Sequence, residues 1–589
     1  MYKQKWIAVV LASYLSAATT LNAQIIEIDK FFYRDFLDLG QNKGAFAAGA
    51  QGVVIESSKQ PGVSVRFEAP IIDQSARSNN GNTTSLGRNF VITATHVAGS
   101  SGDSNNPLVN AQNPELRRWG QTTYSMSANN KSNNYGYDVT FARFNKYIVE
   151  GETEIFDAGL QSDANYTSGN IDKQKEQQNL QNLKKYLKEH ATDSNGNLIV
   201  FQAGSGKLGL FNAPGGGFKD AGIAAITGTR GGSFSRPVDI NGGITYEDSK
   251  ANENINARGI QLIEFTDLDW VNFITPGDSG SGFYIYDKTK QKWLLLGVTA
   301  QADFVGGGTS AIAVATKADF EKFKKENEWE LDLEGDQNWS YEKKHGETAK
   351  FKKNGSNEKE LQTNKDVVFS GGGSIDVKAD MDLLVSSVGG LVFKAKQNNG
   401  SNETIYKITS SGTNSTNGNK PFGFNGSGLD IEENVKVEWG LGFIKGNGTG
   451  DKRGVNDALH KVGKGTLVIT TKYDTPPDDG KYGYLRVGDG KVVFDTESQA
   501  FNGVYLTSGR GTLELVNGKA QAFGAIKDTS QLDSTLPNHF ILNQEHRDKL
   551  GIYFGNGGGN LDLKGNSLTL NAISSNDARA NIINTDEKH

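Results

Sequence analysis

Short runs of apolar and β-branched residues recur in the first half of the chain and predict strands. Residues 89–96 read Asn-Phe-Val-Ile-Thr-Ala-Thr-His, which is typical of a buried strand that ends at its histidine. Residues 139–144 alternate apolar and polar side chains, as a half-buried strand does. The charged stretch 172–190, with leucines at helical spacing, predicts a helix that ends at a solvated His190. A second, amphipathic helix is expected over residues 316–325, where two phenylalanines fall on one face.

The second half of the chain follows a different pattern. Short β-branched strands, such as residues 466–470, 492–494 and 512–515, are separated by Gly, Asn and Asp turns at intervals of about 20–26 residues. That spacing suits the rungs of a parallel β-helix, in which each turn buries its apolar face against its neighbours. A string of small β domains is the alternative. Segment 396–427 is dominated by Asn, Ser, Thr and Gly, and we interpret it as a loop that leaves the rungs.

Length, cysteine content and charge narrow the class of protein. The chain has 589 residues, more than one ordinary core accommodates, so two or more domains are expected. It has no cysteine, so packing and sheet hydrogen bonds must hold the fold without disulfides. A net charge of -6 provides no electrostatic footprint for nucleic acid, and nucleic-acid binding is not expected.

The first 23 residues have the pattern of an export signal. Lys3 and Lys5 precede the apolar run 6–12, and small residues follow up to Ala23. This order predicts a secretory signal peptide over residues 1–23, with cleavage after Ala23. The apolar run is too short for a good membrane span.

The sequence offers no site for a metal or an organic cofactor. Its histidines are scattered, and without cysteine the common structural zinc sites are excluded. The glycine run 215–217 lacks the Lys-Ser/Thr pair and the strand-to-helix setting of a phosphate-binding loop. We therefore expect chemistry that uses side chains and backbone alone.

One glycine-rich turn carries candidate chemistry. Residues 275–281 read Thr-Pro-Gly-Asp-Ser-Gly-Ser, and a serine endopeptidase needs such a turn because its glycines bring main-chain N–H groups close to the reacting carbonyl. Ser279 is the candidate nucleophile, and the N–H groups of Gly277 and Ser279 are the candidate oxyanion hole. Because the chain has 72 glycines, an ordinary loop is the alternative unless a base and an acid complete the site.

Only two of the seven histidines precede this serine. His190 ends a charged helix, whereas His96 closes a buried strand, and a strand end can hold a side chain rigidly at the edge of a cleft. His96 is therefore the candidate general base. A core histidine with its polar atoms satisfied is the alternative.

The candidate acid must orient the imidazole of His96. Asp138 starts the strand 139–144, so its carboxylate would lie at the sheet end beside that ring. Three other aspartates, Asp157, Asp163 and Asp172, occupy loop-like or helical surroundings and remain alternatives. The triad predicted from the residues is His96, Asp138 and Ser279.

At this point the chain resembles a known family, the chymotrypsin-fold serine protease autotransporters that include the immunoglobulin A1 proteases and related self-cleaving adhesin-proteases (peptidase S6). The segment Ala-Arg-Phe-Asn-Lys-Tyr at 142–147 resembles the one after the family's catalytic aspartate, which favours Asp138 over its rivals. The other matching motifs are residues 32–36, 41–44, 275–281, 286–288, 292–298, 459–467, 486–490, 508–512 and 561–569.

The resemblance implies an all-β architecture, with a chymotrypsin-like double β-barrel followed by a right-handed parallel β-helix stalk. The expected organisation is a signal peptide over 1–23, a protease domain over 24–315, a connecting helix and linker over 316–344, and a β-helical stalk over 345–589. A complete autotransporter also has an outer-membrane translocator barrel, which this chain does not contain. We therefore expect the chain to be an incomplete passenger, either a fragment of a longer gene product or a chain whose translocator is encoded elsewhere. It is expected to be exported through the periplasm and outer membrane to the cell surface or the medium.

The resemblance also has implications for substrate specificity and for the alternative functions of the chain. In the chymotrypsin fold the residue six before the nucleophile forms the floor of the primary pocket, which here is Phe273, and Gln301 lies on its wall. Without a carboxylate at the floor, an apolar or small substrate side chain is favoured over a basic one. The expected substrates are extracellular host proteins and the chain's own passenger. A protease-like adhesin that binds host surfaces or sibling molecules is the second hypothesis, and a purely structural passenger is the third.

Overall fold

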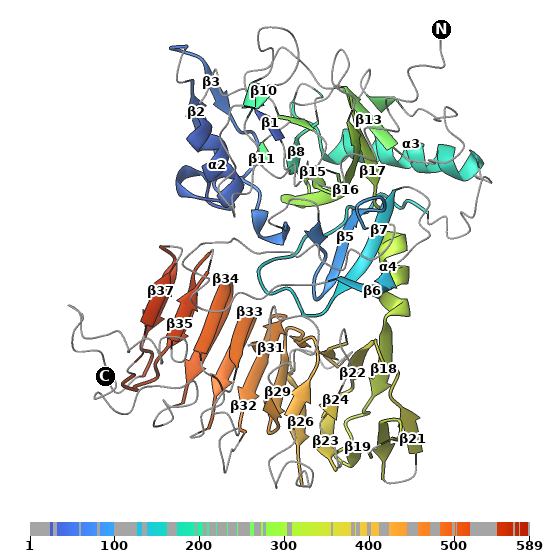
Figure 1. Ribbon diagram of the computed structural model, residues 1–589, viewed down its shortest axis with the longest axis vertical. Helices are drawn as coiled ribbons and strands as arrows, with labels where there is room; N and C mark the ends of the chain where they lie inside the picture. Colours follow the sequence, from blue (N-terminus) through green and yellow to red (C-terminus); the bar gives the residue numbers. More distant parts are fainter. Residues whose placement is uncertain are drawn as a thin grey trace.

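A computed structural model gives the fold (Figure 1). The structure describes residues 24–26, 32–57, 60–78, 83–98, 126–131, 138–161, 173–194, 196, 198–203, 209–210, 219–220, 232–233, 244–245, 259–263, 272–274, 279–302, 309–344, 346–354, 357–378, 383–384, 389–396, 402–411, 423–443, 457–471, 483–496, 501, 503–516, 518, 551–555, 557–568, 570, 572–575 and 578–586. The predicted signal peptide and its cleavage site lie outside these residues. Among the described residues, no helix is both long and apolar enough to cross a membrane.

Two antiparallel sheets dominate the first half of the chain, and they share one apolar core. The four-stranded sheet has the order β4 (Thr84–Ser85), β5 (Phe90–Ala94), β7 (Val139–Phe144) and β6 (Met126–Lys131). The seven-stranded sheet has the order β11 (Gly232–Ser233), β8 (Val200–Ala203), β15 (Gly282–Asp287), β16 (Lys292–Ala302), β17 (Thr309–Val314), β13 (Gly259–Ile263) and β12 (Ile244–Thr245).

Shorter elements surround these sheets. Three strand pairs are β1 (Gln24–Ile26) with β14 (Asn272–Ile274), β2 (Val54–Glu56) with β3 (Ser64–Arg66), and β9 (Gly209–Leu210) with β10 (Lys219–Asp220). The helices are α2 (Tyr33–Gln41), α3 (Lys173–His190) and α4 (Lys317–Glu326), with short 3-10 turns at Gly44–Phe46 and Gln74–Ala76. Helices α3 and α4 confirm the two helices predicted from the sequence pattern.

The second half of the chain is a parallel strand ladder, which occupies the lower part of Figure 1. One face runs through β18 (Glu328–Asp332), β22 (Asp366–Ser370), β25 (Leu391–Phe393), β28 (Leu429–Ile431), β31 (Asp457–Val462), β33 (Tyr484–Phe494), β34 (Gly503–Leu515), β35 (Gly551–Phe554) and β37 (Ala572–Ser575). The second runs through β19 (Trp339–Glu342), β23 (Gly373–Val377), β26 (Thr404–Thr409), β29 (Val435–Trp439), β32 (Thr466–Ile469), β33, β34, β36 (Gly559–Asp562) and β38 (Ala580–Ile583). The third comprises β24 (Leu383–Leu384), β27 (Gly423–Asn425) and β30 (Gly442–Phe443). The antiparallel hairpin β20 (Lys350–Lys353) and β21 (Asn357–Glu360) extends from β19.

Parallel pairing of each strand with its counterpart one turn later makes this ladder a β-helix, as the spacing of the strands predicts. The spacing is regular where Leu485 pairs with Val504 and irregular where Val504 pairs with Ile552. Insertions between rungs therefore interrupt the repeat without breaking the ladder. Such insertions cost little because loop-closure entropy grows slowly with loop length.

Segment 396–427 corrects a prediction. It contains β26 and β27, and β26 pairs in parallel with β23 and β29, so this segment contributes a rung. Its alternation of buried and exposed side chains from Thr404 to Thr409 is the period of a half-buried strand, but the surrounding Asn and Ser conceal it. The ladder also begins at β18, inside the segment 316–344 that the sequence predicts as a connecting helix and linker.

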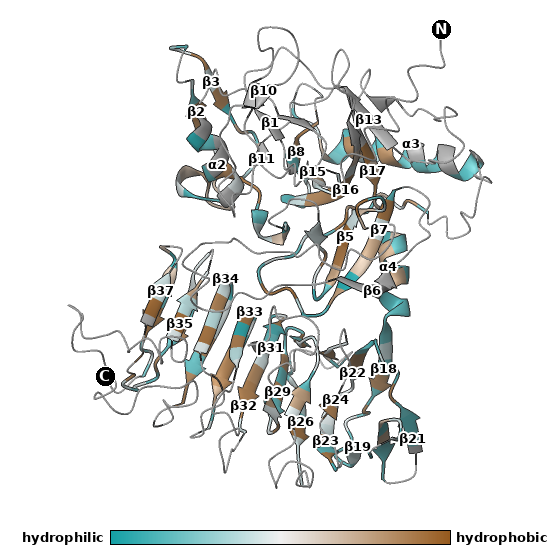
Figure 2. Cartoon of the chain, in the orientation of Figure 1, coloured by the Kyte–Doolittle hydropathy of each residue, from teal (hydrophilic) through white to brown (hydrophobic). Residues whose placement is uncertain are grey.

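Strand β7 also differs from its prediction, because all six of its side chains are buried. Helix α4 covers one face: Phe320 and Phe323 contact the rings of Phe90 and Phe141. The other face includes Arg143, which reaches into the β-helix. Figure 2 shows the apolar residues of β5 and β7 between the upper sheet and the ladder. A strand between two packed layers is buried on both faces, whatever the alternation of its residues.

Residues 145–150, which we call the strap, continue from β7 and lie against the β-helix. Within the strap, the N–H of Tyr147 donates to Ser427 O at 2.9 Å, and its carbonyl accepts from His460 Nδ1 at 2.6 Å. A methyl group on Gly428 would come 2.8 Å from the Tyr147 ring and 2.6 Å from His460 O, so only glycine fits there. The strap therefore fastens the first half of the chain to the rungs.

Tyr147 provides a test of this packing. Its ring is fully buried, and among the described residues its hydroxyl has no hydrogen-bond partner. We expect Tyr147→Phe to be at least as stable as the wild type, by up to about 1 kcal/mol, because it removes an unsatisfied buried group. Tyr147→Ala should lose about 3–5 kcal/mol through the cavity that it leaves. Urea unfolding followed by tryptophan fluorescence measures both, and a Phe variant clearly less stable than wild type would contradict the packing described.

Candidate active site

The structure brings His96 and Asp138 together at one end of the β5–β7 pair. Ala94 and Val139 are register partners, so the residues that follow β5 and precede β7 meet at the same sheet end. His96 Nδ1 lies 2.8 Å from Asp138 Oδ2 and 3.0 Å from Oδ1. Because an ionised carboxylate only accepts hydrogen bonds, Nδ1 carries the proton and Nε2 is left as an acceptor.

Backbone hydrogen bonds hold this pair in place. The His96 N–H donates to Asp138 Oδ1 at 3.1 Å, and the Thr95 N–H donates to the Asp138 carbonyl at 3.0 Å. Asp138 has a φ of 58°, a left-handed backbone conformation that residues other than glycine rarely adopt. Residues held in such a conformation cluster at functional sites. The side chain of Asp138 is 15% exposed and that of His96 is 50% exposed, so the ring is accessible from outside while its partner is sheltered.

Ser279 lies in the turn that leads into β15. The N–H of the next residue, Gly280, donates to Thr299 O at 2.7 Å, and the Thr299 N–H donates to Ser281 O at 2.8 Å. Gly280 has a φ of 85°, which this tight turn requires and glycine supplies without strain. These two bonds fasten the Ser279 turn to β16.

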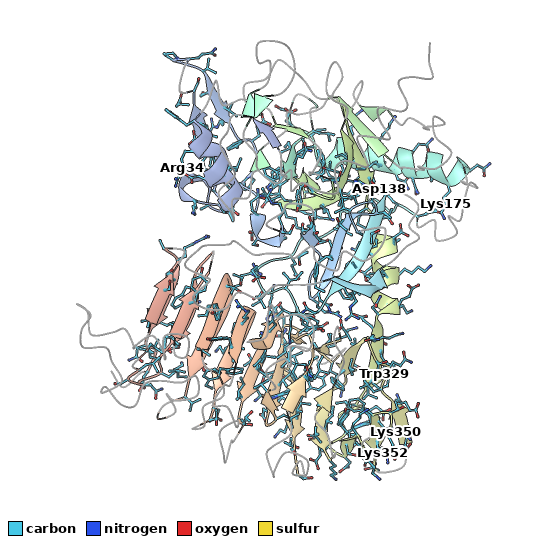
Figure 3. All side chains as sticks on the ribbon, viewed as in Figure 1. Arg34, Asp138, Lys175, Trp329, Lys350 and Lys352 are labelled. Carbon is cyan, nitrogen blue, oxygen red and sulfur yellow. The ribbon has the colours of Figure 1, made fainter. Side chains whose placement is uncertain are left out.

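Strand β16 contacts β5, the strand that leads to His96. Ser279, fastened to β16, therefore belongs to the sheet that packs against β5. Figure 3 shows Asp138 at the end of β7 that points toward this upper sheet. The remaining predicted site residues are less fully described. Gly277 lies outside the described residues, and for Phe273 and Gln301 the structure gives only the backbone, where they pair with Ile25 and Ala311.

The rival residues have other roles or lie outside the described part. His190 packs its ring 4.8 Å from that of Tyr186 and contacts Thr289 Oγ1 at 2.9 Å through Nδ1, so it is more enclosed than a solvated helix end. Asp157 accepts from the N–H of Gly159, which lowers the pKa of this carboxyl group, and its ion pair with Lys317 lowers it further. Asp163 and Asp172 lie outside the described residues.

Two residues on the strand that follows Asp138 are absent from the sequence prediction. Thr140 Oγ1 donates to Thr95 Oγ1 at 2.9 Å and ties the two strand ends together. Arg143 is charged, yet it is fully buried in a strand whose other residues are mostly apolar. A charged residue inside such a strand is itself a signal, because a buried guanidinium needs an acidic partner.

No metal site is found in the described ranges, where no group of three or more His, Cys, Asp or Glu side chains could hold an ion. The arrangement of donors instead suits proton transfer. The acceptor nitrogen of an oriented, half-exposed imidazole can remove a proton from a hydroxyl group.

Comparison with known proteins identifies the family. The family model described as immunoglobulin A1 protease (Peptidase_S6) matches residues 24–319. The chain belongs to the immunoglobulin A1 protease family. Two curated relatives of this family member are the serine protease EspP of Escherichia coli, 29% identical over 571 residues, and the serine protease pet autotransporter of Escherichia coli O44:H18, 27% identical over 586 residues. They cover 96% and 98% of this chain, whereas the chain spans only 35% and 36% of their lengths.

Two solved structures share the fold of this family member. The passenger domain of plasmid encoded toxin from enteroaggregative Escherichia coli aligns with a TM-score of 0.64 at 24% identity, covering 95% of this chain and 47% of that one. The Haemophilus influenzae Hap adhesin aligns with a TM-score of 0.61 at 20% identity, covering 95% of this chain and 54% of that one. The chain therefore has the mostly-β fold of autotransporter passengers.

Proposed function

We propose that this chain is the passenger of a secreted serine endopeptidase whose catalytic residues are His96, Asp138 and Ser279. The observation that carries the proposal is the bond of 2.8 Å between His96 Nδ1 and Asp138 Oδ2, at the end of the β5–β7 strand pair. Strand β5 contacts β16, to which the Ser279 turn is hydrogen-bonded. Membership of the immunoglobulin A1 protease family supports the same chemistry.

The mechanism follows from the roles of the three side chains. Ser279 Oγ attacks the carbonyl carbon of the scissile peptide while its proton passes to His96 Nε2. Asp138 keeps Nδ1 protonated and stabilises the imidazolium that forms. The oxyanion accepts hydrogen bonds from the N–H groups of Gly277 and Ser279. His96 then gives its proton to the leaving amine, and a water molecule activated by His96 hydrolyses the acyl-enzyme.

The proposal includes the finer architecture. The four-stranded and seven-stranded sheets would belong to the two barrels of a chymotrypsin-like protease, with His96 and Asp138 from the first and Ser279 from the second. The ladder would be a right-handed parallel β-helix. The proposed boundaries are a signal peptide over 1–23, the protease over 24–315, the connecting segment over 316–344 and the stalk over 345–589, except that the first strand of the ladder, β18, already lies within 316–344.

Specificity would come from the primary pocket beside the Ser279 turn. We assign Phe273 to its floor and Gln301 to its wall. An apolar floor favours small or apolar substrate side chains, because a basic side chain would bury its charge without a partner.

Location and partners follow the relatives that are named autotransporters. The passenger would be exported to the cell surface or the medium through an outer-membrane translocator barrel. It would cleave extracellular host proteins and its own passenger. The likeness to the Hap adhesin favours a second function, in which the β-helix binds host surfaces or neighbouring cells.

The proposed activity is tested by labelling of the purified chain with a fluorophosphonate, which reacts with serines activated by a base. We expect one labelled site, identified as Ser279 by peptide mass spectrometry, and no labelling of Ser279→Ala or of heat-denatured protein. A folded wild-type chain that does not react would contradict the proposed activity and leave the adhesin function.

A further inference from the structure

A buried carboxylate of the β-helix contacts both strands that carry the proposed base and acid. Asp366 is the first residue of β22 and is fully buried. We propose that Asp366 is a positioning residue for the His96–Asp138 pair, so that the stalk is part of the catalytic apparatus. This inference rests on the proposed serine protease function.

Both carboxylate oxygens of Asp366 accept hydrogen bonds. Its Oδ1 accepts hydrogen bonds from Arg143 Nη2 and from the N–H of Gly390, the latter at 2.9 Å. Its Oδ2 accepts from Arg88 Nη1 at 3.1 Å. Charge-assisted bonds of this kind are stronger than neutral ones, and in a buried site they also fix geometry. Asp366 therefore fixes two arginines from the first half of the chain.

Both arginines lie close to the strands that lead to the site. Arg143 is on β7, opposite Phe90 of β5, and Arg88 lies two residues before the first residue of β5. The guanidinium carbons of Arg143 and Arg88 lie 5.2 Å and 5.7 Å from the centroid of the Phe90 ring. The ion cluster thus clamps one end of the β5–β7 pair, and His96 and Asp138 occupy the other end.

Further bonds make the clamp rigid. Arg143 Nη1 donates to Asn364 O at 2.8 Å, just before β22. Arg88 Nε donates to Asp430 Oδ2 at 3.0 Å, on the rung that contains β28. The strand pair is consequently held by adjacent rungs and cannot tilt on the β-helix without breaking charged contacts.

The distance from the ion cluster to the His96–Asp138 pair distinguishes a mechanical effect of Asp366 from a direct electrostatic effect. The five residue steps along extended strand from Asp138 to Arg143 span about 17 Å. Exposed charges are screened over about 10 Å at 0.1 M salt, and two arginines partly offset the charges of Asp366 and of its neighbours Asp430 and Glu328. Asp366 therefore acts through the direction of the strands and not through its field at the imidazole.

The test compares the full chain with its Asp366→Asn variant. Asparagine keeps the size of the side chain but turns one acceptor into a donor that faces a guanidinium. We expect the rate of fluorophosphonate inactivation at saturating reagent to fall by roughly 10- to 100-fold, as misplacement of catalytic groups by about 1 Å does. The half-saturating concentration of reagent should not change. Asp562→Asn is the matched control, because Asp562 is a buried carboxylate of β36 that binds Thr585 and Lys564, and this variant should react like wild type.

A double-mutant cycle distinguishes positioning from general weakening of the fold. If Asp366 acts through the catalytic pair, Asp366→Asn should have little further effect in an Asp138→Asn chain, whereas general weakening would multiply the two losses. Arg143→Lys is the second variant, because it keeps the buried charge pair but loses the planar contact to Asn364. It should fold and show a smaller decrease in the rate of inactivation at saturating reagent. It therefore tests the positioning role of Asp366 if Asp366→Asn does not fold.

The outcomes separate this inference from the function on which it rests. A folded wild-type chain that does not react overturns the proposed protease. A reactive wild type, with folded Asp366→Asn or Arg143→Lys chains that react at the wild-type rate, overturns the positioning role alone. Fully multiplicative losses in the cycle also overturn it.

Discussion

Ser279→Ala is expected to reduce peptide-bond cleavage by about a millionfold while the chain folds and is secreted normally. In the proposed mechanism the hydroxyl group supplies the attacking oxygen, and Ser279 is only partly buried, so its loss removes chemistry and little packing. What remains is the contribution of the oxyanion hole and of substrate binding, about a thousandfold over water. The measurement is kcat on a fluorogenic peptide selected from a library with the wild-type chain.

His96→Ala should be about as severe, because nucleophile and base act as a unit and their losses do not add. Circular dichroism and resistance to trypsin should match the wild type for both variants. If Ser279→Ala retained more than roughly a hundredth of wild-type kcat, the nucleophile would be another residue.

Asp138→Asn is expected to lower kcat at neutral pH by about three to four orders of magnitude with little change in KM. The carboxylate accepts from both His96 Nδ1 and the His96 backbone N–H. An asparagine can still accept from the backbone, but its NH2 group would then face Nδ1 and require an unprotonated nitrogen there. The proton would move to Nε2, which could no longer receive the proton of Ser279. The same fluorogenic peptide measures this loss.

Asp157→Asn is the control for this substitution. Asp157 pairs with Lys317 at the start of α4, so its replacement should leave kcat nearly unchanged. Near-normal turnover of Asp138→Asn, combined with a large loss at Asp157 or Asp163, would assign the orienting role to the other aspartate.

Several features of this protein could be predicted from the sequence because their causes are local. Apolar β-branched runs marked β5 and the ladder strands, and α3 and α4 followed from helical spacing. The pairing of His96 with Asp138 was accessible for a related reason. Each residue lies beside a recognisable strand end, and antiparallel neighbours bring such ends together.

Other features depend on partners distant in the chain, and only the tertiary structure decided them. The alternation in β7 predicts one solvent-exposed face, but α4 and the β-helix cover both faces of the strand. The composition around Thr404–Thr409 predicts a loop, yet pairing with β23 and β29 makes it a rung. Arg143 and Asp366 are 223 residues apart in the chain, and no sequence period joins them. Their ion pair forms because folding buries both charges at one place, where each is the partner that makes burial of the other tolerable.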